Sequence, residues 1–258
     1  MTTHPVRVGV TVRPQHTTVD RMRETWFEAE AIGADDVYIW DHFFPLFGDA
    51  EGGHFECWTL LAALAETTTR VRIGPLVSAI GYRNPHLIAD MARTIDHISG
   101  GRFILGLGSG WNERDYDEYE YDFTTAPDRL RDLRAKLQVI RERLGKLNPP
   151  PLQNPMPIMI GGSGEKVTLR LVAEHAQMWN GFGDPKEAGR LSGVLDDWCA
   201  RVGRNPAEIE RSILAGAANV VANADDYVAN GITTLIVGVD GPEQVPVLRD
   251  LVAWRDSR

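Results

Sequence analysis

The sequence contains few cysteines and no long hydrophobic segment. Cys57 and Cys199 are the only two cysteines among 258 residues, and both fall in segments with amphipathic, helix-like spacing. We therefore expect buried or half-buried thiols rather than a disulfide or a metal-binding pair. No apolar run approaches the roughly 20 residues that cross a bilayer, and the first residues, MTTHPVRVGV, lack the pattern of a secretory signal. A cytoplasmic protein without a membrane segment is expected.

The sequence also lacks an excess of basic charge. Lys and Arg number 27 against 36 Asp and Glu, which gives a formal net charge of −9, and the two signs are interspersed. Because a nucleic-acid-binding surface needs a basic face, we expect no nucleic-acid partner. The chain has neither a G-x-S-x-G nor an H-E-x-x-H motif, which weakens a hydrolase interpretation. No metal is assigned to five histidines that share no ligand spacing: His16, His54, His86, His97 and His175.

Residues 74–113 carry the most informative pattern. They read as a strand, a polar loop, a helix and a second strand that ends in a glycine-rich turn. Both strands are almost continuous apolar runs, as in parallel strands that are buried on both faces. One helical face carries the apolar residues Leu87, Ile88, Met91, Ile95 and Ile98. Since polar residues follow both strands, the pattern indicates a site at the carboxyl ends of parallel strands.

Strands and helices are predicted to alternate along the whole chain. The predicted strands are 6–12, 36–40, 71–77, 103–108, 157–160, 177–181, 211–215 and 234–239. The predicted helices are 19–32, 57–66, 85–98, 128–144, 165–175, 186–202, 224–230 and 243–255. Eight alternating units favour a closed (β/α)8 barrel of the TIM type, with an open doubly wound sheet as the alternative. We expect one α/β domain over residues 1–258, with the proline-rich segment 144–157 as an extended surface loop.

The end of the second predicted strand offers a candidate acid or base. The sequence there is Trp40-Asp41-His42-Phe43. A histidine at the carboxyl end of a strand can donate a proton or bond to a ring cofactor. A loop histidine that bonds only to the backbone is the alternative.

A glycine-rich turn follows the fifth predicted strand, directly before a helix. Its glycines are Gly161, Gly162 and Gly164, followed by Glu165. Glycines let backbone amides approach an anion, and the amino end of a helix favours negative charge. The pattern matches neither a Walker loop nor G-x-G-x-x-G. It predicts a phosphate-binding loop, with an ordinary tight turn as the alternative.

A second glycine-rich turn contains Ser109, Gly110, Trp111 and Asn112. Its small residues permit the close approach of a flat ligand, and Trp111 is a candidate pocket wall. A plain turn with a core tryptophan is the alternative. The segment that follows, DYDEYEYDF, is both acidic and aromatic, and we interpret it as a solvated or lid-like face.

Four segments together resemble the bacterial-luciferase-like monooxygenase superfamily, especially its branch that uses coenzyme F420, a deazaflavin. They are WDHFFP (40–45), GPLVSAIGYRNP (74–85), SGGRFILGLGSGWNE (99–113) and IGGSGEK (160–166). The resemblance covers nearly the whole chain and implies a TIM-like barrel. The chain looks shortened around 144–157 and 215–230, where relatives have longer inserts.

The resemblance also implies residue roles. Asp41 and His42 match the aspartate-histidine pair beside the deazaflavin, where the histidine is an acid, base or electrostatic partner of the ring. Val77 and Ser78 match a bulge, often with a non-proline cis peptide, that backs the ring. The residues that match the lining of the cofactor side chain are Ser109, Gly110 and Asn112. Those that match the phosphate loop are Gly161, Gly162, Gly164 and Glu165.

One departure bears on the substrate. Trp111 stands where sugar-phosphate dehydrogenases of this family have a catalytic glutamate, so a sugar phosphate is disfavoured. The expected function is hydride transfer between C5 of coenzyme F420 and a small organic substrate, in the direction that reduces an activated double bond or carbonyl. The alternatives are an FMN-dependent monooxygenase and a non-catalytic cofactor-binding or partner subunit. A homodimer is expected from the family.

Overall fold

The buried apolar strands form one parallel sheet that closes on itself. The computed structural model describes residues 4–258, so the first three residues of the expected 1–258 domain lie outside it. The sheet order is β3-β2-β1-β9-β8-β7-β6-β5-β4. The strands are β1 Arg7–Val12, β2 Asp36–Ile39, β3 Arg72–Pro75, β4 Ser78–Ala79, β5 Leu105–Gly108, β6 Ile158–Gly161, β7 Met178–Gly181, β8 Glu210–Ala215 and β9 Thr234–Val239. The two ends of the sheet, β3 and β4, are consecutive pieces of chain, so the sheet forms a barrel.

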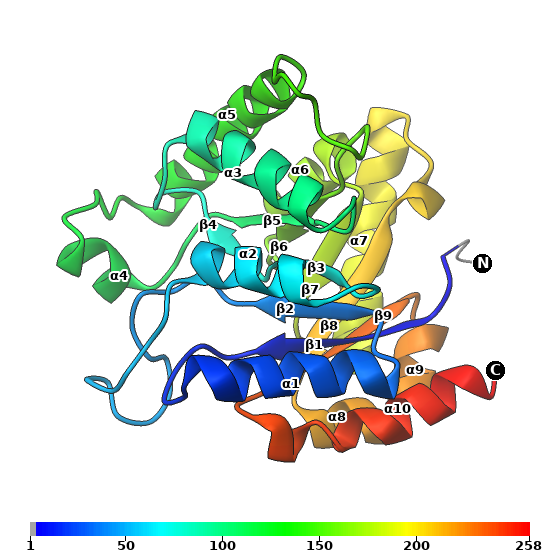
Figure 1. The fold of residues 1–258 in the computed structure, drawn as a ribbon. Helices are drawn as coiled ribbons and strands as arrows, with labels where there is room; N and C mark the ends of the chain where they lie inside the picture. Colours follow the sequence, from blue (N-terminus) through cyan, green and yellow to red (C-terminus); the bar gives the residue numbers. More distant parts are fainter. Residues whose placement is uncertain (1–3) are drawn as a thin grey trace.

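Helices cover the outside of this barrel (Figure 1). They are α1 Val19–Ile32, α2 Cys57–Thr67, α3 Pro85–Ile98, α4 Glu113–Glu118, α5 Ala126–Leu144, α6 Thr168–His175, α7 Pro185–Val202, α8 Ala217–Ala222, α9 Ala224–Ala229 and α10 Val247–Asp256. Polar caps begin three of the long helices, because the side chains of Asn84, Thr125 and Asp184 accept hydrogen bonds from first-turn amides. The prediction of an α/β barrel is confirmed, and the open sheet is excluded.

The third predicted strand, 71–77, is wrong as a continuous element. It breaks into β3 and β4, and the peptide bond between Leu76 and Val77 is cis. The break directs Val77 toward the glycines of the neighbouring strands. A Cβ on Gly108 would lie 2.8 Å from Cγ2 of Val77, and one on Gly161 would lie 2.9 Å from the same atom. The missing side chains of these glycines therefore make room for Val77.

The amino-terminal end of the barrel is closed by a buried ionic network. Nε of Arg72 donates to Asp36 at 2.5 Å, and its Nη2 donates to Glu210 at 2.7 Å. Thr234 donates a further hydrogen bond to Glu210. Burial raises the pKa of Asp36, although the positive charge of Arg72 opposes this. Glu210 is also buried, but the hydrogen bonds and charge of Arg72 bring its pKa below the ordinary value.

Several predicted helix boundaries need correction. The helix predicted at 165–175 begins only at Thr168, because the glycine turn continues up to that point and Gly162 has a φ of 125°. The helix predicted at 224–230 corresponds to α9, and a further short helix that was not predicted, α8, precedes it, separated by Asn223, whose side chain bonds back to Asn219. The helix predicted at 243–255 starts after Pro246. Helix α4 lies where a solvated or lid-like face was expected.

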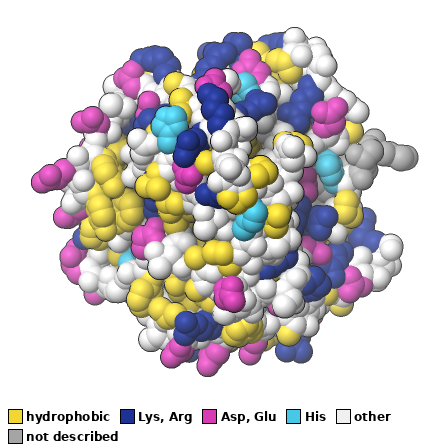
Figure 2. Space-filling model, turned by 45° about the horizontal axis from the view of Figure 1, so that its top comes forward, with side chains coloured by type: hydrophobic (Ala, Val, Ile, Leu, Met, Phe, Trp, Pro, Cys, Tyr) yellow, Lys and Arg dark blue, Asp and Glu magenta, His cyan; other side chains and the backbone are white. Residues whose placement is uncertain are grey.

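Other predictions from the sequence concern the cysteines, membrane-spanning helices, metal ligands and surface charge. Both cysteines are free and buried, as predicted. None of the helices in residues 4–258 is long and apolar enough to span a membrane, and no cluster of potential metal ligands occurs there. Basic and acidic side chains are interspersed over the face drawn in Figure 2.

The arrows of β1 and β2 in Figure 1 point toward the side where α4 lies, and the C terminus lies on the opposite side.

The contact between Val77 and Gly108 leads to a coupled-mutation prediction. We expect Gly108→Ala to cost about 1–3 kcal/mol in the free energy of unfolding, because a methyl group would overlap a stiff valine side chain. In a Val77→Ala background the same substitution should cost less than about 0.5 kcal/mol. Urea unfolding of the two single variants and the double variant measures this coupling. Strictly additive costs would contradict the proposed contact.

The closing ionic network leads to a second prediction. Arg72→Met should destabilise the protein by about 3–5 kcal/mol, since it leaves buried Asp36 without its paired cation and Glu210 with only Arg7, at 3.9 Å. The control is Arg131→Met, which breaks an exposed pair with Asp128 and should cost less than about 1 kcal/mol. Urea unfolding of both variants gives the comparison. Equal costs would mean that the buried network contributes no more than a surface pair.

Candidate active site

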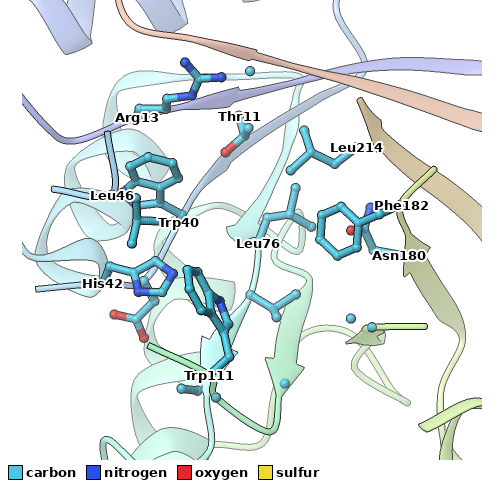
Figure 3. Close-up of a pocket in the computed structure, with 18 of the residues that line it drawn as sticks. Thr11, Arg13, Trp40, His42, Leu46, Leu76, Trp111, Asn180, Phe182 and Leu214 are labelled. Carbon is cyan, nitrogen blue, oxygen red and sulfur yellow. The ribbon is translucent and has the colours of Figure 1, made fainter. Parts of the chain in front are cut away.

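A cavity of about 570 Å³ opens at the carboxyl ends of the strands. Most of its lining is apolar, and Figure 3 shows His42 between Trp40 and Trp111, with Phe182 and Leu214 on the opposite side. The lining residues are Thr11, Arg13, Trp40, Asp41, His42, Leu46, Phe47, Leu76, Val77, Ala79, Tyr82, Gly108, Ser109, Gly110, Trp111, Gly161, Gly162, Asn180, Phe182, Leu214, Ala215, Gly216 and Gly238. The cavity thus lies at the end of the barrel where the sequence predicts a site.

Asp41 is a buried carboxylate whose oxygens are already occupied. Arg83 donates to both oxygens, at 2.5 and 3.0 Å, and Ser78 donates to Oδ2 at 2.5 Å. The indole of Trp58 donates to Asp41 at 3.2 Å and to the Ser78 hydroxyl at 2.8 Å. Ser78 itself is fully buried and does not line the cavity. Asp41 therefore holds the chain in place directly after Val77.

His42 is fixed by a residue that the sequence analysis did not identify. Its Nδ1 lies 2.5 Å from Oδ2 of Asp115, a fully buried residue of α4. Tyr82 and the backbone amide of Phe43 also donate to Asp115, at 2.7 and 3.0 Å. Burial alone would raise the pKa of Asp115, but the hydrogen bonds from His42, Tyr82 and Phe43 outweigh it and lower the pKa below the ordinary value.

The segment that contains Asp115 is only in part the solvated face that its composition predicted. DYDEYEYDF is rich in charge, yet Asp115 and Tyr116 are both buried. Apolar spacing was the only sequence signal available, and it is weak in a six-residue helix. Asn112, which was expected near the cofactor, instead lies outside the cavity and donates to Asp115 at 3.0 Å.

Helix α4 is tied to the loop between β2 and α2. The guanidinium of Arg114 donates to Glu51 at 2.6 Å and to the carbonyl of Ala50 at 2.7 Å. It also lies 4.2 Å from the ring centroid of Phe44. Both segments that surround His42 are thereby joined to each other.

Aromatic side chains form the rim of the cavity. Trp111 is 65% exposed and its ring centroid lies 5.6 Å from that of His42. Phe182, which Figure 3 shows across the cavity, is 51% exposed. Trp40 approaches His42 edge-on, at 6.0 Å between centroids. A ligand that bridged this rim would cover a large apolar surface.

Polar groups in the cavity are few. Arg13 is the only Lys or Arg among the described residues of the lining, and both oxygens of Asp240 accept hydrogen bonds from it, at 3.0 and 3.1 Å. The hydroxyl of Thr11 is buried without a hydrogen-bond partner among residues 4–258. Such an orphaned polar group in an apolar cavity is costly unless a ligand or water satisfies it.

The predicted phosphate loop lies only partly in the cavity. Gly161 and Gly162 line it, but Gly164 and Glu165 do not. The carboxylate of Glu165 is exposed and accepts a hydrogen bond from Arg190 of α7 at 2.9 Å. Of the other turn, Ser109, Gly110 and Trp111 line the cavity. The structure thus gathers most of the expected residues in one place.

The sequence matches proteins that are named for coenzyme F420. It is 38% identical over 117 residues to an F420-dependent glucose-6-phosphate dehydrogenase of Amycolatopsis mediterranei, covering 44% of this chain and 34% of the relative. It is 30% identical over 221 residues to a putative coenzyme F420-dependent oxidoreductase of Mycobacterium tuberculosis, covering 76% of this chain and 60% of the relative. The chain therefore spans less than two thirds of the length of either curated relative.

Solved structures share the fold at low sequence identity. An F420-dependent secondary alcohol dehydrogenase in complex with an F420-acetone adduct superposes with a TM-score of 0.86 at 14% identity, covering 97% of this chain and 99% of that one. A coenzyme F420-dependent tetrahydromethanopterin reductase from Methanopyrus kandleri gives a TM-score of 0.79 at 16% identity, covering 96% and 97%. The family model described as luciferase-like monooxygenase matches residues 1–236. The chain therefore belongs to the luciferase-like monooxygenase family.

Proposed function

We propose that the protein is an oxidoreductase that uses coenzyme F420 to reduce a carbonyl or an activated double bond of a small apolar substrate. The observation that carries the proposal is the cavity at the carboxyl end of the barrel, which combines a glycine-lined wall with a histidine held by a buried carboxylate. The relatives named for F420 support the choice of cofactor.

The residues present suit a flat ring. Gly108 and Gly161 have no side chain, and Val77 fills the space beside them, so the wall they form has only short groups. The cavity volume of about 570 Å³ falls within the range of small-molecule sites. The unpartnered hydroxyl of Thr11 supplies a hydrogen-bonding group for a polar ring edge or for the substrate.

The turn after β6 suits a phosphate. Gly162 lines the cavity and adopts a φ of 125°, which favours glycine. The exposed residues 163–167 follow it and lead into α6. Backbone amides of this turn would hold the phosphate of the cofactor side chain, while Ser109 and Gly110 would contact that side chain. Glu165 would stay with Arg190 and outside the contact.

The protein would contribute to the reaction by orienting the cofactor and substrate and by holding or delivering a proton. When bound, the deazaflavin accepts or supplies a hydride at its C5. His42 would hold or deliver the accompanying proton at Nε2, since Nδ1 faces Asp115. Trp111 and Phe182 would cover the substrate and exclude water. Asp41 would act on the ring indirectly, by holding Ser78 and Val77 in place.

The lining favours an apolar substrate over a sugar phosphate. Arg13 is already paired with Asp240, and the cavity lining in residues 4–258 has no other lysine or arginine to bind a phosphate. Trp111 offers no exchangeable carboxyl proton at the position of the family's glutamate. Its exposed indole instead provides a surface for an apolar or planar substrate.

An FMN-dependent monooxygenase is the second candidate. The name of the matching family, luciferase-like monooxygenase, supports the monooxygenase part of this candidate. A homodimer, expected from the family, and a cytoplasmic location, expected from the sequence, stay predictions.

The cofactor assignment predicts a binding preference and a charge effect. Fluorescence titration should show that F420 binds more tightly than FMN. Ser163→Asp should weaken F420 binding by about tenfold or more, because it places a negative charge in the exposed turn that would hold the phosphate. The matched control, Ser163→Asn, has the same size without the charge and should bind within about threefold of wild type. Tight FMN binding without F420 binding would favour the monooxygenase. Equal loss of affinity in Ser163→Asp and Ser163→Asn would show that this turn does not bind the phosphate.

The substrate assignment predicts a pattern of activity. With reduced F420, wild type should reduce apolar enones or ketones, and with oxidised F420 it should leave glucose 6-phosphate unchanged. His42→Ala should keep most of its cofactor affinity yet lose roughly 10²-fold or more in turnover, the usual scale of acid-base assistance. His86→Ala, an exposed histidine at the start of α3, is the control and should turn over normally. Rapid oxidation of the sugar phosphate would refute the argument from Trp111.

A further inference from the structure

The carboxylate of Asp115 is surrounded by donors from separate parts of the chain. Its Oδ2 atom contacts the imidazole of His42, the phenol of Tyr82 and the amide of Asn112, and its Oδ1 accepts from the backbone of Phe43. Burial and the hydrogen bond to Asp115 raise the pKa of Tyr82, so the phenol stays protonated and continues to donate. Asp115 is therefore an ionised acceptor with fixed geometry.

This arrangement decides which nitrogen of His42 carries the proton. A carboxylate can only accept hydrogen bonds, so Nδ1 must be the protonated nitrogen at the 2.5 Å contact with Asp115. Nε2 is then the nitrogen available to a ligand. Trp40 and Trp111 lie beside the imidazole at steep interplanar angles, 88° and 70°, with ring centroids 6.0 and 5.6 Å away.

The other ionisable groups around His42 do not replace Asp115. His54, from the loop after β2, has its pKa lowered to about 4 by burial and by the nearby His42, so it is neutral at working pH. The carboxylate of Asp41 forms an ion pair with the guanidinium of Arg83. Arg114, the neighbour of Asp115 on α4, is paired with Glu51. Asp115 is thus the carboxylate that His42 contacts directly.

We infer that Asp115 is a positioning residue, which sets the Nδ1–H tautomer of His42 and stabilises its imidazolium so that Nε2–H delivers a proton to the substrate oxygen. This inference rests on the proposed function. The Nε2–H bond breaks and leaves its electron pair on nitrogen. The new O–H bond forms with the electron pair that the carbonyl π bond, or the conjugated system of an enone, releases as carbon accepts hydride from the reduced cofactor. Solvent then reprotonates Nε2.

The tautomer can be tested without cofactor or substrate. Nitrogen-15 NMR of histidine-labelled protein, at a pH where the imidazoles are neutral, should show His42 protonated at Nδ1. In Asp115→Asn the Nε2–H form should appear as well, since the carboxylate that selects Nδ1–H is gone. Glu113→Gln, an exposed change on the same helix, should leave the His42 signal as in wild type. A wild-type His42 protonated at Nε2 would overturn the inference even if Asp115→Asn failed to fold.

The kinetic consequence separates positioning from a purely structural role. In folded Asp115→Asn, kcat for enone or ketone reduction should fall roughly 10²-fold or more while KM changes less than about threefold. Glu113→Gln should behave as wild type. An unchanged kcat in the folded variant would overturn the inference, whereas a wild type with the Nδ1–H form but no F420 binding would refute the proposed function instead.

Discussion

The entry of Val77 into the barrel is the constraint on which the site depends. A side chain at this point needs room, and the neighbouring strands supply it with glycines at 108 and 161. The same glycines leave the upper part of the barrel without side chains to fill it, so a cavity remains above the apolar layer that contains Met159 and Ile236. The glycines at 108 and 161 thus explain both how Val77 is packed and why the cavity is present.

Charge is arranged differently at the two ends of the barrel. At the closed end, Arg72 joins two buried carboxylates, Asp36 and Glu210. At the open end, Arg83 and Asp41 form a comparable buried pair, in which Asp41 lines the cavity and accepts a hydrogen bond from Ser78. In both places a buried ion pair fixes backbone geometry. At the open end the imidazole of His42 also reaches the cavity.

The sequence predicted the features that depend on local periodicity and missed those that depend on distant contacts. Alternating apolar segments were sufficient for the barrel, the order of its elements and the loops that form the site. The break after Pro75 has no signal in apolar periodicity; only the family resemblance pointed to it. Asp115 was missed because its burial depends on donors at positions 42, 43 and 82, far away in the sequence. A charged residue in an acidic segment looks solvated until those partners are known.

The link that Arg114 makes between α4 and the loop after β2 has a consequence for the entropy of ligand binding. The side chains of His42 and Asp115 are held before any ligand arrives, because their two segments are fastened to each other at Glu51 and Ala50. Groups that are ordered during folding do not have to lose rotamer freedom again on binding. The exposed rim residues Trp111 and Phe182 are therefore where ligand-induced ordering is left to occur. His42, which is proposed to hold the proton, and Asp115 are thus fixed in advance, whereas Trp111 and Phe182 can adapt to the ligand.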